Sequence, residues 1–488
     1  MATIQRLGLT DVIVFGMLLA VAAGVRVWFL SIAADNGTTI GPLRVQDARP
    51  PAPADTNPRG RSTGTELDVL AGNLKDKNQF ACRPPFAQQV EETAHVSPGY
   101  PYFLSLLDRV SDGPDKADQV ARWLQAGLGA LTAGLYFVIA LVAFRSRVVA
   151  ILAGLFCAAH PFWIVNAADI DDGVVATFLL ALALFLGTRG GIAGGALTSL
   201  LFGLSLAALA LFRAALLPFA FVALLWYVMR CRSVPRGWLS AVLSVLGFAN
   251  GLAPWAVRNW QAYREPMPIV DSAYFHLWMG SNPRADGGPM NNYELHTAMT
   301  DEAKQRLNQQ TSRREIYQTL GEETLKAVSD DPGGCLRQRI QALLTFLFGQ
   351  SSAVFRVGGG GGLVAKVGDV ETMPQWLCQN LELVFYGSTC VVIFLGVVGW
   401  RWTYAWRRES RLLALATIFV PLPYILSHAE ALVGPRLPLD GVLLTFAAYA
   451  LACLVPGVGV ALFPGPEGVE VEAASRRRLH QDEAHDRF

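Results

Sequence analysis

The chain has 488 residues, of which 52% are hydrophobic and only 16% are charged, and its 40 Lys plus Arg nearly balance its 39 Asp plus Glu. A soluble globular protein carries about 25% charged residues, so much of the usual water-facing charge is missing. This composition excludes an intrinsically disordered chain and a nucleic-acid-binding polycation, and the mean hydropathy of +0.34 indicates a polytopic membrane protein. More than half of the charged residues fall in segments 34–118 and 258–380, which we expect to be aqueous.

Apolar runs long enough to cross a bilayer recur along the chain. A hydrocarbon core about 30 Å thick needs roughly 20 apolar residues in helical form, because an unpaired backbone polar group is costly in lipid. We expect about ten such helices, over residues 11–33, 119–143, 148–167, 172–188, 191–211, 213–229, 237–257, 380–400, 411–428 and 437–456. Arg26 interrupts the first run, which favours an uncleaved first helix over a signal peptide.

Basic residues gather in one set of the loops between these runs. Glu409 is the only acid among them, and the bases are Arg145, Arg147, Arg189, Arg230, Arg232, Arg236, Arg401, Arg407, Arg408 and Arg411. The positive-inside rule makes this side cytoplasmic. Both termini are then expected in the cytoplasm, and both charged segments on the outer face.

The predicted organisation follows from this topology. The apolar run Ile340–Phe355 is only about 16 residues long and is flanked by arginines, so we expect an interfacial or re-entrant helix there. The expected parts are a first transmembrane helix (1–33), a first outer loop (34–118), helices two to seven (119–257), a second outer segment with the helix at 340–356 (258–379), three last transmembrane helices (380–456) and a cytoplasmic tail (457–488).

The first outer loop contains a short amphipathic pattern over residues 63–74. Its apolar positions fall on one helical face, and they are Leu67, Leu70, Ala71 and Leu74. We expect this helix to lie along the membrane surface, with Glu66 and Asp68 in its first turn. These acids either provide a catalytic carboxylate or only complement the helix dipole. The turn His95–Pro101 follows, and there we expect His95 on the surface.

A second group of acids precedes the fourth apolar run. Asp169, Asp171 and Asp172 repel one another, which raises the pKa of at least one of them and suits a base or a metal site. The alternative is a solvated turn in which Asp172 caps the next helix.

Three arginines fall at outer ends of the predicted spans, namely Arg213, Arg258 and Arg436. Their planar guanidinium groups suit a lipid phosphate, although arginine at a span end also snorkels to headgroups. His428 lies near Arg436 in sequence, where it either assists a leaving phosphate or is a satisfied helix-end histidine. We expect Trp255, Trp260 and Trp278 in the interfacial aromatic belt.

The second outer segment predicts amphipathic helices over 301–310 and 313–328, which end at a break over 330–334. Ile316, Leu320 and Leu325 share one face, and about 80 residues suffice for a small helical lid over a site. The cysteines have no metal-site spacing, and an outer disulfide among Cys82, Cys335 and Cys378 stays open.

Several stretches resemble one family when they are taken in chain order. They are the turn Pro98-Gly99-Tyr100-Pro101, the Phe212-Arg213 pair, Pro254-Trp255-Ala256-Val257-Arg258-Asn259, Gly280-Ser281-Asn282, His428, and Arg436-Leu437-Pro438. The sequence is similar in these stretches to the GT-C fold glycosyltransferases that use lipid-carrier sugars, in the branch of the protein O-mannosyltransferases and bacterial aminoarabinose transferases. The family usually has an Asp in the first outer loop where this chain has Thr63.

The resemblance implies an all-α polytopic GT-C-like fold and an inverting glycosyltransferase. The donor would be a polyprenyl-phosphate sugar held among membrane lipid, and the acceptor a protein, lipid or glycan, on the outer face of the cytoplasmic (inner) membrane; nucleic acid is not an expected partner. The catalytic candidates are Glu66, Asp68, Asp171 and Asp172, and the candidates for the donor phosphate are Arg213, Arg258, Arg436 and His428. No cofactor is certain, and a divalent metal stays open.

Two rival functions stay open. A catalytically degenerate scaffold is compatible with Thr63. A membrane transporter would be expected to have internal repeats and mid-span polar sites, whereas we find no repeat and the polar candidates cluster at span ends.

Overall fold

The computed structural model describes residues 8–35, 40–42, 66–83, 86, 90–193, 195–233, 237–288, 290, 292–309, 313–348, 355–357, 390–402, 410–429 and 434–454. Within these residues the chain is almost entirely helical, with two short antiparallel strand pairs. This confirms the predicted all-α polytopic membrane fold.

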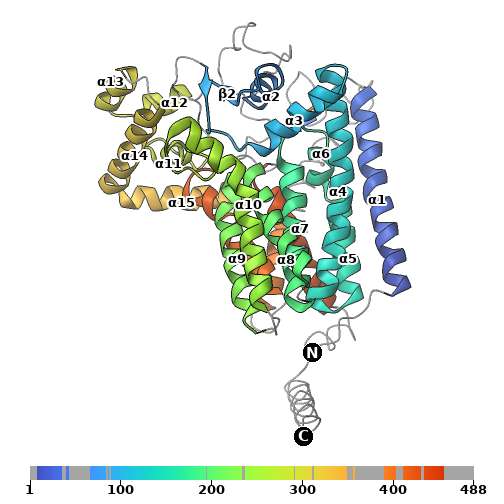
Figure 1. The fold of residues 1–488 in the computed structure, drawn as a ribbon. Helices are drawn as coiled ribbons and strands as arrows, with labels where there is room; N and C mark the ends of the chain where they lie inside the picture. The colour runs from blue at the N-terminus through green and yellow to red at the C-terminus, as the bar shows by residue number, and fades with distance from the viewer. Residues whose placement is uncertain are drawn as a thin grey trace, which may run out of the picture.

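The apolar helices form one bundle (Figure 1). In chain order they are α1 (Leu9–Asp35), α4 (Pro114–Phe144), α5 (Arg147–Ala159), α6 (Pro161–Asn166), α7 (Gly173–Ala193), α8 (Ala196–Phe212), η2 (Ala214–Leu216), α9 (Leu217–Cys231), α10 (Gly237–Tyr263), a helix over Cys390–Trp402, α17 (Arg411–Phe419), α18 (Leu422–Leu426) and α19 (Leu437–Leu454). Five helical segments among the described residues are long and apolar enough to cross a membrane, and five shorter ones are apolar. All ten overlap the predicted runs, while the number of crossings stays a prediction.

Proline breaks two of the runs that the sequence presents as continuous. Pro161 follows the end of α5, and Pro421 lies between α17 and α18. Proline has no N–H and clashes with the preceding turn, so each run divides into two shorter helices.

Small residues let helices α8 and α10 of the bundle pack closely along each other. A Cβ added at Gly203 of α8 would lie 2.0 Å from the carbonyl oxygen of Ser244 in α10. Glycine is therefore required where these two backbones meet, as in other close helix pairs in membranes. The bundle core is filled by buried aromatic and aliphatic side chains, including Phe137, Phe219 and Phe446.

The two charged segments lie together at one end of the bundle (Figure 1). The first provides β1 (Ile40–Pro42), α2 (Glu66–Lys77), β2 (Ala81–Cys82), β3 (Glu91–Glu92) and α3 (Gly99–Val110), and the second provides α11 (Ala273–Ser281), α12 (Asn292–Thr297), α13 (Asp301–Gln309), α14 (Arg313–Asp330), α15 (Pro332–Phe348) and β4 (Phe355–Val357). Strand β1 pairs with β4, and β2 pairs with β3. The outer segments are thus joined by backbone pairing as well as by side chains.

Helix α2 has Glu66 and Asp68 in its first turn, as predicted, and its apolar face packs against protein. Leu70, Ala71 and Leu74 are buried against protein, in clusters that also contain Trp255 of α10 and Tyr100 of α3. The amphipathic pattern correctly predicted a helix, but the apolar side chains of α2 contact protein and not lipid. An apolar stripe alone does not show whether it faces lipid or a neighbouring helix.

The second outer segment has a core of its own. Helices α13 and α14 match the prediction, and α11, α12 and α14 enclose a cluster that includes Trp278, Ile316 and Leu320. Leu325 is 72% exposed, so the prediction that it shares the buried face is wrong. The predicted break is only one residue long, since Asp331 accepts from Gly334 N at 2.8 Å and α15 follows at once.

Helix α15 runs across the direction of the bundle helices in Figure 1. It begins at Pro332, eight positions before the apolar run, and ends at Phe348. Leu336, Ile340 and Leu344 form an exposed stripe on one face. This orientation suits the interfacial helix that the sequence predicts.

Candidate functional site

The turn between α6 and α7 carries the acids that the sequence singles out. Asp171 is buried, and its Oδ1 accepts from Gly173 N at 2.8 Å while its Oδ2 accepts from Asn166 Nδ2 at 3.2 Å. Asp171 thus caps the first turn of α7, the role that the sequence offered to Asp172. A Cβ at Gly173 would lie 2.7 Å from Asn166 Oδ1, so glycine lets this turn close.

Asp172 instead makes a two-bond ion pair with Arg213. Arg213 Nε donates to Asp172 Oδ2 at 2.7 Å, and Nη2 donates to Oδ1 at 2.6 Å. Arg213 follows the last residue of α8 in an extended conformation, and its Nη1 donates to the carbonyl oxygen of Gly434 at 2.6 Å. One guanidinium therefore ties the start of α7, the end of α8 and the segment before α19.

A buried tyrosine joins this turn to the first outer loop. Tyr100 Oη donates to Gln125 Oε1 at 2.7 Å, and Gln125 Nε2 donates to the carbonyl oxygen of Asp169 at 2.6 Å. Arg122 Nε donates to the carbonyl oxygen of Ala168 at 2.9 Å. The Pro-Gly-Tyr-Pro turn thus supports the backbone of the acid turn through Gln125, and Arg122 of the same helix α4 binds that backbone directly.

Electrostatics around Tyr100 show which acids converge. Burial and then the negative charges of Asp171, Asp169, Asp172 and Asp68 raise the pKa of Tyr100 well above its usual value. Asp68, from α2, thus acts on the same tyrosine as the acid turn, and the cluster around Tyr100 also contains Ala71 of α2 and Val175 of α7. Glu66, two residues earlier, acts on a different group, since burial, Asp271 and Glu66 raise the pKa of Tyr317 on α14.

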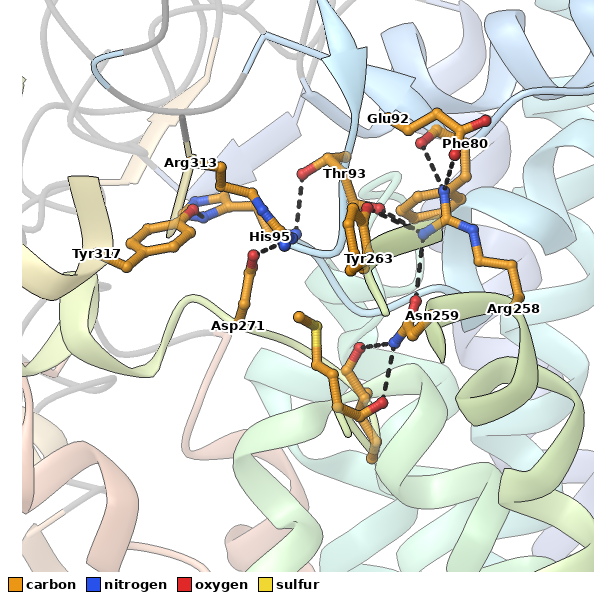
Figure 2. A network of polar contacts seen from close by, with 12 residues as sticks. Phe80, Glu92, Thr93, His95, Arg258, Asn259, Tyr263, Asp271, Arg313 and Tyr317 are labelled. Atoms are coloured by element: carbon orange, nitrogen blue, oxygen red, sulfur yellow. Dashed lines mark hydrogen bonds and ion pairs between the residues drawn. The ribbon is translucent and has the colours of Figure 1, made fainter. Parts of the chain in front are cut away.

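Arg258 lies in a separate network, shown in Figure 2. Its Nη1 donates to the carbonyl oxygen of Thr93 at 3.0 Å and to Tyr263 Oη at 3.1 Å, and its Nη2 donates to the carbonyl oxygen of Phe80 at 3.2 Å. Glu92 lies 3.6 Å away as an ion-pair partner. Arg258 holds the first outer loop on the end of α10, and no contact recorded among the described residues joins it to Asp172.

Neighbours of Arg258 in its motif also anchor backbone. Trp255 Nε1 donates to the carbonyl oxygen of Ile269 at 2.7 Å, and Asn259 Nδ2 donates to the same oxygen at 3.1 Å. The Pro-Trp-x-x-Arg-Asn stretch therefore fastens the chain that returns from α10 toward α11. Trp255 and Trp278 are buried, so their assignment to the aromatic belt is wrong, whereas Trp260 is 51% exposed.

Arg436 and His428 have protein partners of their own. Arg436 Nε lies 2.8 Å from Asp440 Oδ1 one turn further along, and Asp440 Oδ2 lies 3.8 Å from His160 Nε2. His428 Nε2 lies 3.0 Å from His276 Nδ1, with the two rings stacked. The structure thus pairs Arg436 with Asp440 of α19, and it places His428 against His276 of the second outer segment.

Sequence reasoning missed a buried polar cluster between the outer segments. His95 is buried, contrary to the prediction, and its Nδ1 lies 2.6 Å from Tyr317 Oη (Figure 2). Asp271 forms an ion pair with Arg313, which lies 3.7 Å from the ring centroid of Tyr263. Burial raises the pKa of Asp271 to about 6 despite the charge of Arg313. These partners are up to 222 residues apart in the chain, so no local pattern could pair them.

Metal and disulfide chemistry find no support among the described residues. No group of three or more His, Cys, Asp or Glu side chains there could hold a metal ion. Cys335 is a free cysteine, and Cys378 lies outside the described residues. Thr63 also lies outside them.

Comparison with known proteins gives no match to a family model or to a curated sequence. The chain is similar to the crystal structure of the oligosaccharyltransferase AglB from Archaeoglobus fulgidus, with 12% identity, a TM-score of 0.49, and coverage of 90% of this chain and 50% of that one. It is also similar to ArnT from Cupriavidus metallidurans bound to undecaprenyl phosphate, with 13% identity, a TM-score of 0.33, and coverage of 91% and 79%. Both have the GT-C fold that the sequence motifs resemble, and the chain spans about half the length of AglB.

Proposed function

We propose that the protein is a membrane glycosyltransferase that moves a sugar from a polyprenyl-phosphate donor to an acceptor on the outer face of the cytoplasmic membrane. The supporting observation is the meeting of acids from two distant segments, Asp68 and the turn 169–172, around Tyr100 and beside Arg213. The positive-inside rule motivates the outer face.

The reaction would use these groups as follows. A carboxylate accepts the proton of the acceptor hydroxyl or amine as that atom attacks the anomeric carbon, and the bond from this carbon to the phosphate oxygen breaks with inversion. The phosphate leaves with the electron pair and is held by a cation. Arg213 suits that role because its guanidinium presents a planar fork at the acid turn.

The carboxylates differ in how well they suit the role of base. Asp171 is buried and accepts two hydrogen bonds, so we assign it to positioning of the turn. Asp172, whose side chain is 25% exposed, is the strongest candidate. Asp68 is buried near Tyr100, and Glu66 would act from the side of Tyr317. Arg258, Arg436 and His428 would then support the architecture around the donor.

Turnover of a panel of polyprenyl-phosphate sugars by purified protein in lipid tests the proposal. Replacing Asp171 and Asp172 together by asparagine should lower turnover by at least about 100-fold, the usual effect of losing a general base. Equal turnover by the wild type and this variant would remove the acid turn from the mechanism.

A catalytically degenerate scaffold is the second candidate, because Thr63 stands where the resemblance leads us to expect an acid. Such a protein would bind the lipid phosphate without turning over any donor. Introducing an acid by Thr63→Asp should then create turnover, whereas an active enzyme that uses Asp68 or Asp172 should gain little.

A further inference from the structure

The pair between Asp172 and Arg213 occupies the groups that the proposed donor would need. Both hydrogen bonds are short, at 2.6 and 2.7 Å, and they use the Nε and Nη2 edge of the guanidinium. This is the edge that binds a carboxylate or a phosphate with two parallel bonds. A phosphate can therefore take this edge only when Asp172 leaves it.

The geometry points to an exchange of anions on Arg213. We propose that the donor phosphate displaces Asp172 from Arg213, and that the displaced carboxylate becomes the base that accepts the acceptor's proton. This inference rests on the proposed function and adds an order of events to it. The phosphate binds first, and its binding frees the Asp172 carboxylate to act as the base.

The surroundings of the pair favour such an exchange. The Arg213 side chain is 11% exposed, whereas that of Asp172 is 25% exposed, so the carboxylate is the accessible partner. Arg213 keeps a further bond to the carbonyl oxygen of Gly434 that does not involve Asp172. The guanidinium would thus stay in place while its anion changes.

A cation that is nearly buried is unstable without an anion, because removing one partner of a buried ion pair leaves an uncompensated charge. Arg213 would therefore always hold one anion, either Asp172 or the phosphate. Helix α7 also begins directly after Asp172, so the positive end of this helix adds to the attraction.

The same exchange would help the product to leave. Transfer breaks the sugar–phosphate bond and converts a phosphodiester with one negative charge into a phosphomonoester with up to two. The monoester would bind Arg213 more tightly than the donor does. The return of Asp172, after it has passed its proton to water, would compete with the product for the guanidinium.

Direct binding measurements test this exchange without any need for turnover. The probe is undecaprenyl phosphate in detergent micelles, with neutral undecaprenol as the control for the tail and inorganic phosphate as the control for a free anion. Asp172→Asn removes the competing carboxylate, and Asp172→Glu keeps the negative charge. Asp115→Asn removes an exposed acid from the outer end of α4.

We expect Asp172→Asn to bind undecaprenyl phosphate at least about fivefold more tightly than the wild type, the lower end of ordinary coupling between two ligands. Asp172→Glu should show no such gain, Asp115→Asn should match the wild type, and Arg213→Gln should lose most of the affinity. Undecaprenol should not compete. Arg213→Lys, which keeps the charge but loses the fork, should bind more weakly than the wild type.

The outcomes that would overturn the inference are distinct. Wild-type binding with no gain in Asp172→Asn would refute the exchange and leave the proposed function standing. If neither the wild type nor Asp172→Asn bound the lipid phosphate, the proposed function would fail as well. Inorganic phosphate that bound as tightly as the lipid would show a free-anion site and overturn the assignment to the donor. A gain seen equally in Asp115→Asn would show only a general effect of charge.

Discussion

Arg26 of α1 donates through Nη1 to the carbonyl oxygen of Ala158 at 3.2 Å, at the end of α5 and 132 residues away in the chain. Its Nη2 reaches the carbonyl oxygen of Cys157 at 3.5 Å. In an unbroken helix the Cys157 carbonyl would accept from residue 161, but Pro161 has no N–H. The arginine that interrupts the first apolar run therefore supplies donors to a helix end that proline leaves unsatisfied inside the bundle.

Replacing Arg26 by methionine should lower the free energy of unfolding by about 3 kcal/mol, because buried carbonyl groups would lose their donors. Thermal unfolding of the purified protein in detergent measures this effect. Val27→Ala is the matched control, since Val27 is the next residue and is 42% exposed. Equal melting of Arg26→Met and the wild type would show that α5 ends without help from Arg26.

Gly280 is the glycine of the Gly-Ser-Asn stretch, and it lies against the backbone before His428. A Cβ at this position would lie 1.6 Å from the carbonyl oxygen of Ser427, so Gly280→Ala must separate α11 from that segment. We expect a loss of about 2 kcal/mol in the free energy of unfolding, as for other overpacked sites.

Gly127→Ala is the control for Gly280→Ala, because a Cβ at Gly127 meets nothing within 4 Å. It should leave the melting temperature unchanged or raise it slightly, as alanine favours helix more than glycine does. Equal effects of the two substitutions would mean that the contact with Ser427 is not tight in solution.

Most of the helices could be predicted from the sequence, and the partners of their side chains could not. The apolar runs, the first turn of α2 with Glu66 and Asp68, and the helices α13 and α14 each depend on a local period, which a single sequence displays. The burial of His95 depends on Tyr317, which belongs to a different outer segment. Such burial has no local signal.

The candidate site shows the same division. The sequence placed Asp172 and Arg213 at outer span ends, and the structure pairs them directly. It also placed Arg258 at a span end, but there the guanidinium binds the carbonyl oxygens of Thr93 and Phe80. The sequence places both arginines at the end of a predicted span, so it cannot show that Arg213 binds a carboxylate whereas Arg258 binds mainly backbone carbonyl oxygens. That difference depends on the path of the first outer loop.

Tyr100→Phe tests whether the tyrosine supports the acid turn. Loss of the hydroxyl leaves Gln125 without its donor in a buried site, and we expect the free energy of unfolding to fall by about 1 kcal/mol. If the proposed transfer activity is present, the maximal rate should fall more than the affinity for donor, since the turn carrying the acids would lose its support.

Tyr102→Phe is the matched control for Tyr100→Phe, because Tyr102 lies on the same helix and is 47% exposed. It should change neither the stability nor the rate.

Gln125→Glu should behave like Tyr100→Phe, since it removes the amide donor to the carbonyl oxygen of Asp169. Wild-type rates of transfer in both Tyr100→Phe and Gln125→Glu would refute the idea that Tyr100 and Gln125 support the acid turn.

We expect the free energy of unfolding to depend on pH through Asp271, and the surroundings of this carboxyl set the direction of that dependence. Burial, which outweighs the charge of Arg313, raises its pKa from 3.8 to about 6 in the folded protein. Between these values the folded state binds more protons than the unfolded state, so the contribution of Asp271 to stability falls as pH rises from about 4 to about 6. Asp271→Asn has no such titration. The variant should therefore gain on the order of 2 kcal/mol over the wild type across this window, measured by thermal unfolding at several pH values.

The difference between wild type and Asp271→Asn isolates this carboxyl, because all other titrating groups are common to both. Glu265→Gln is the control for loss of an acid in an exposed pair, since Glu265 and Arg314 lie 2.8 Å apart with side chains 36% and 73% exposed. It should shift the unfolding free energy by less than about 1 kcal/mol. A wild type that instead gains stability over Asp271→Asn as pH rises would mean that Arg313 lowers the pKa of Asp271 more than burial raises it, and the ion pair would then be a stabilising link between the loop before α11 and α14.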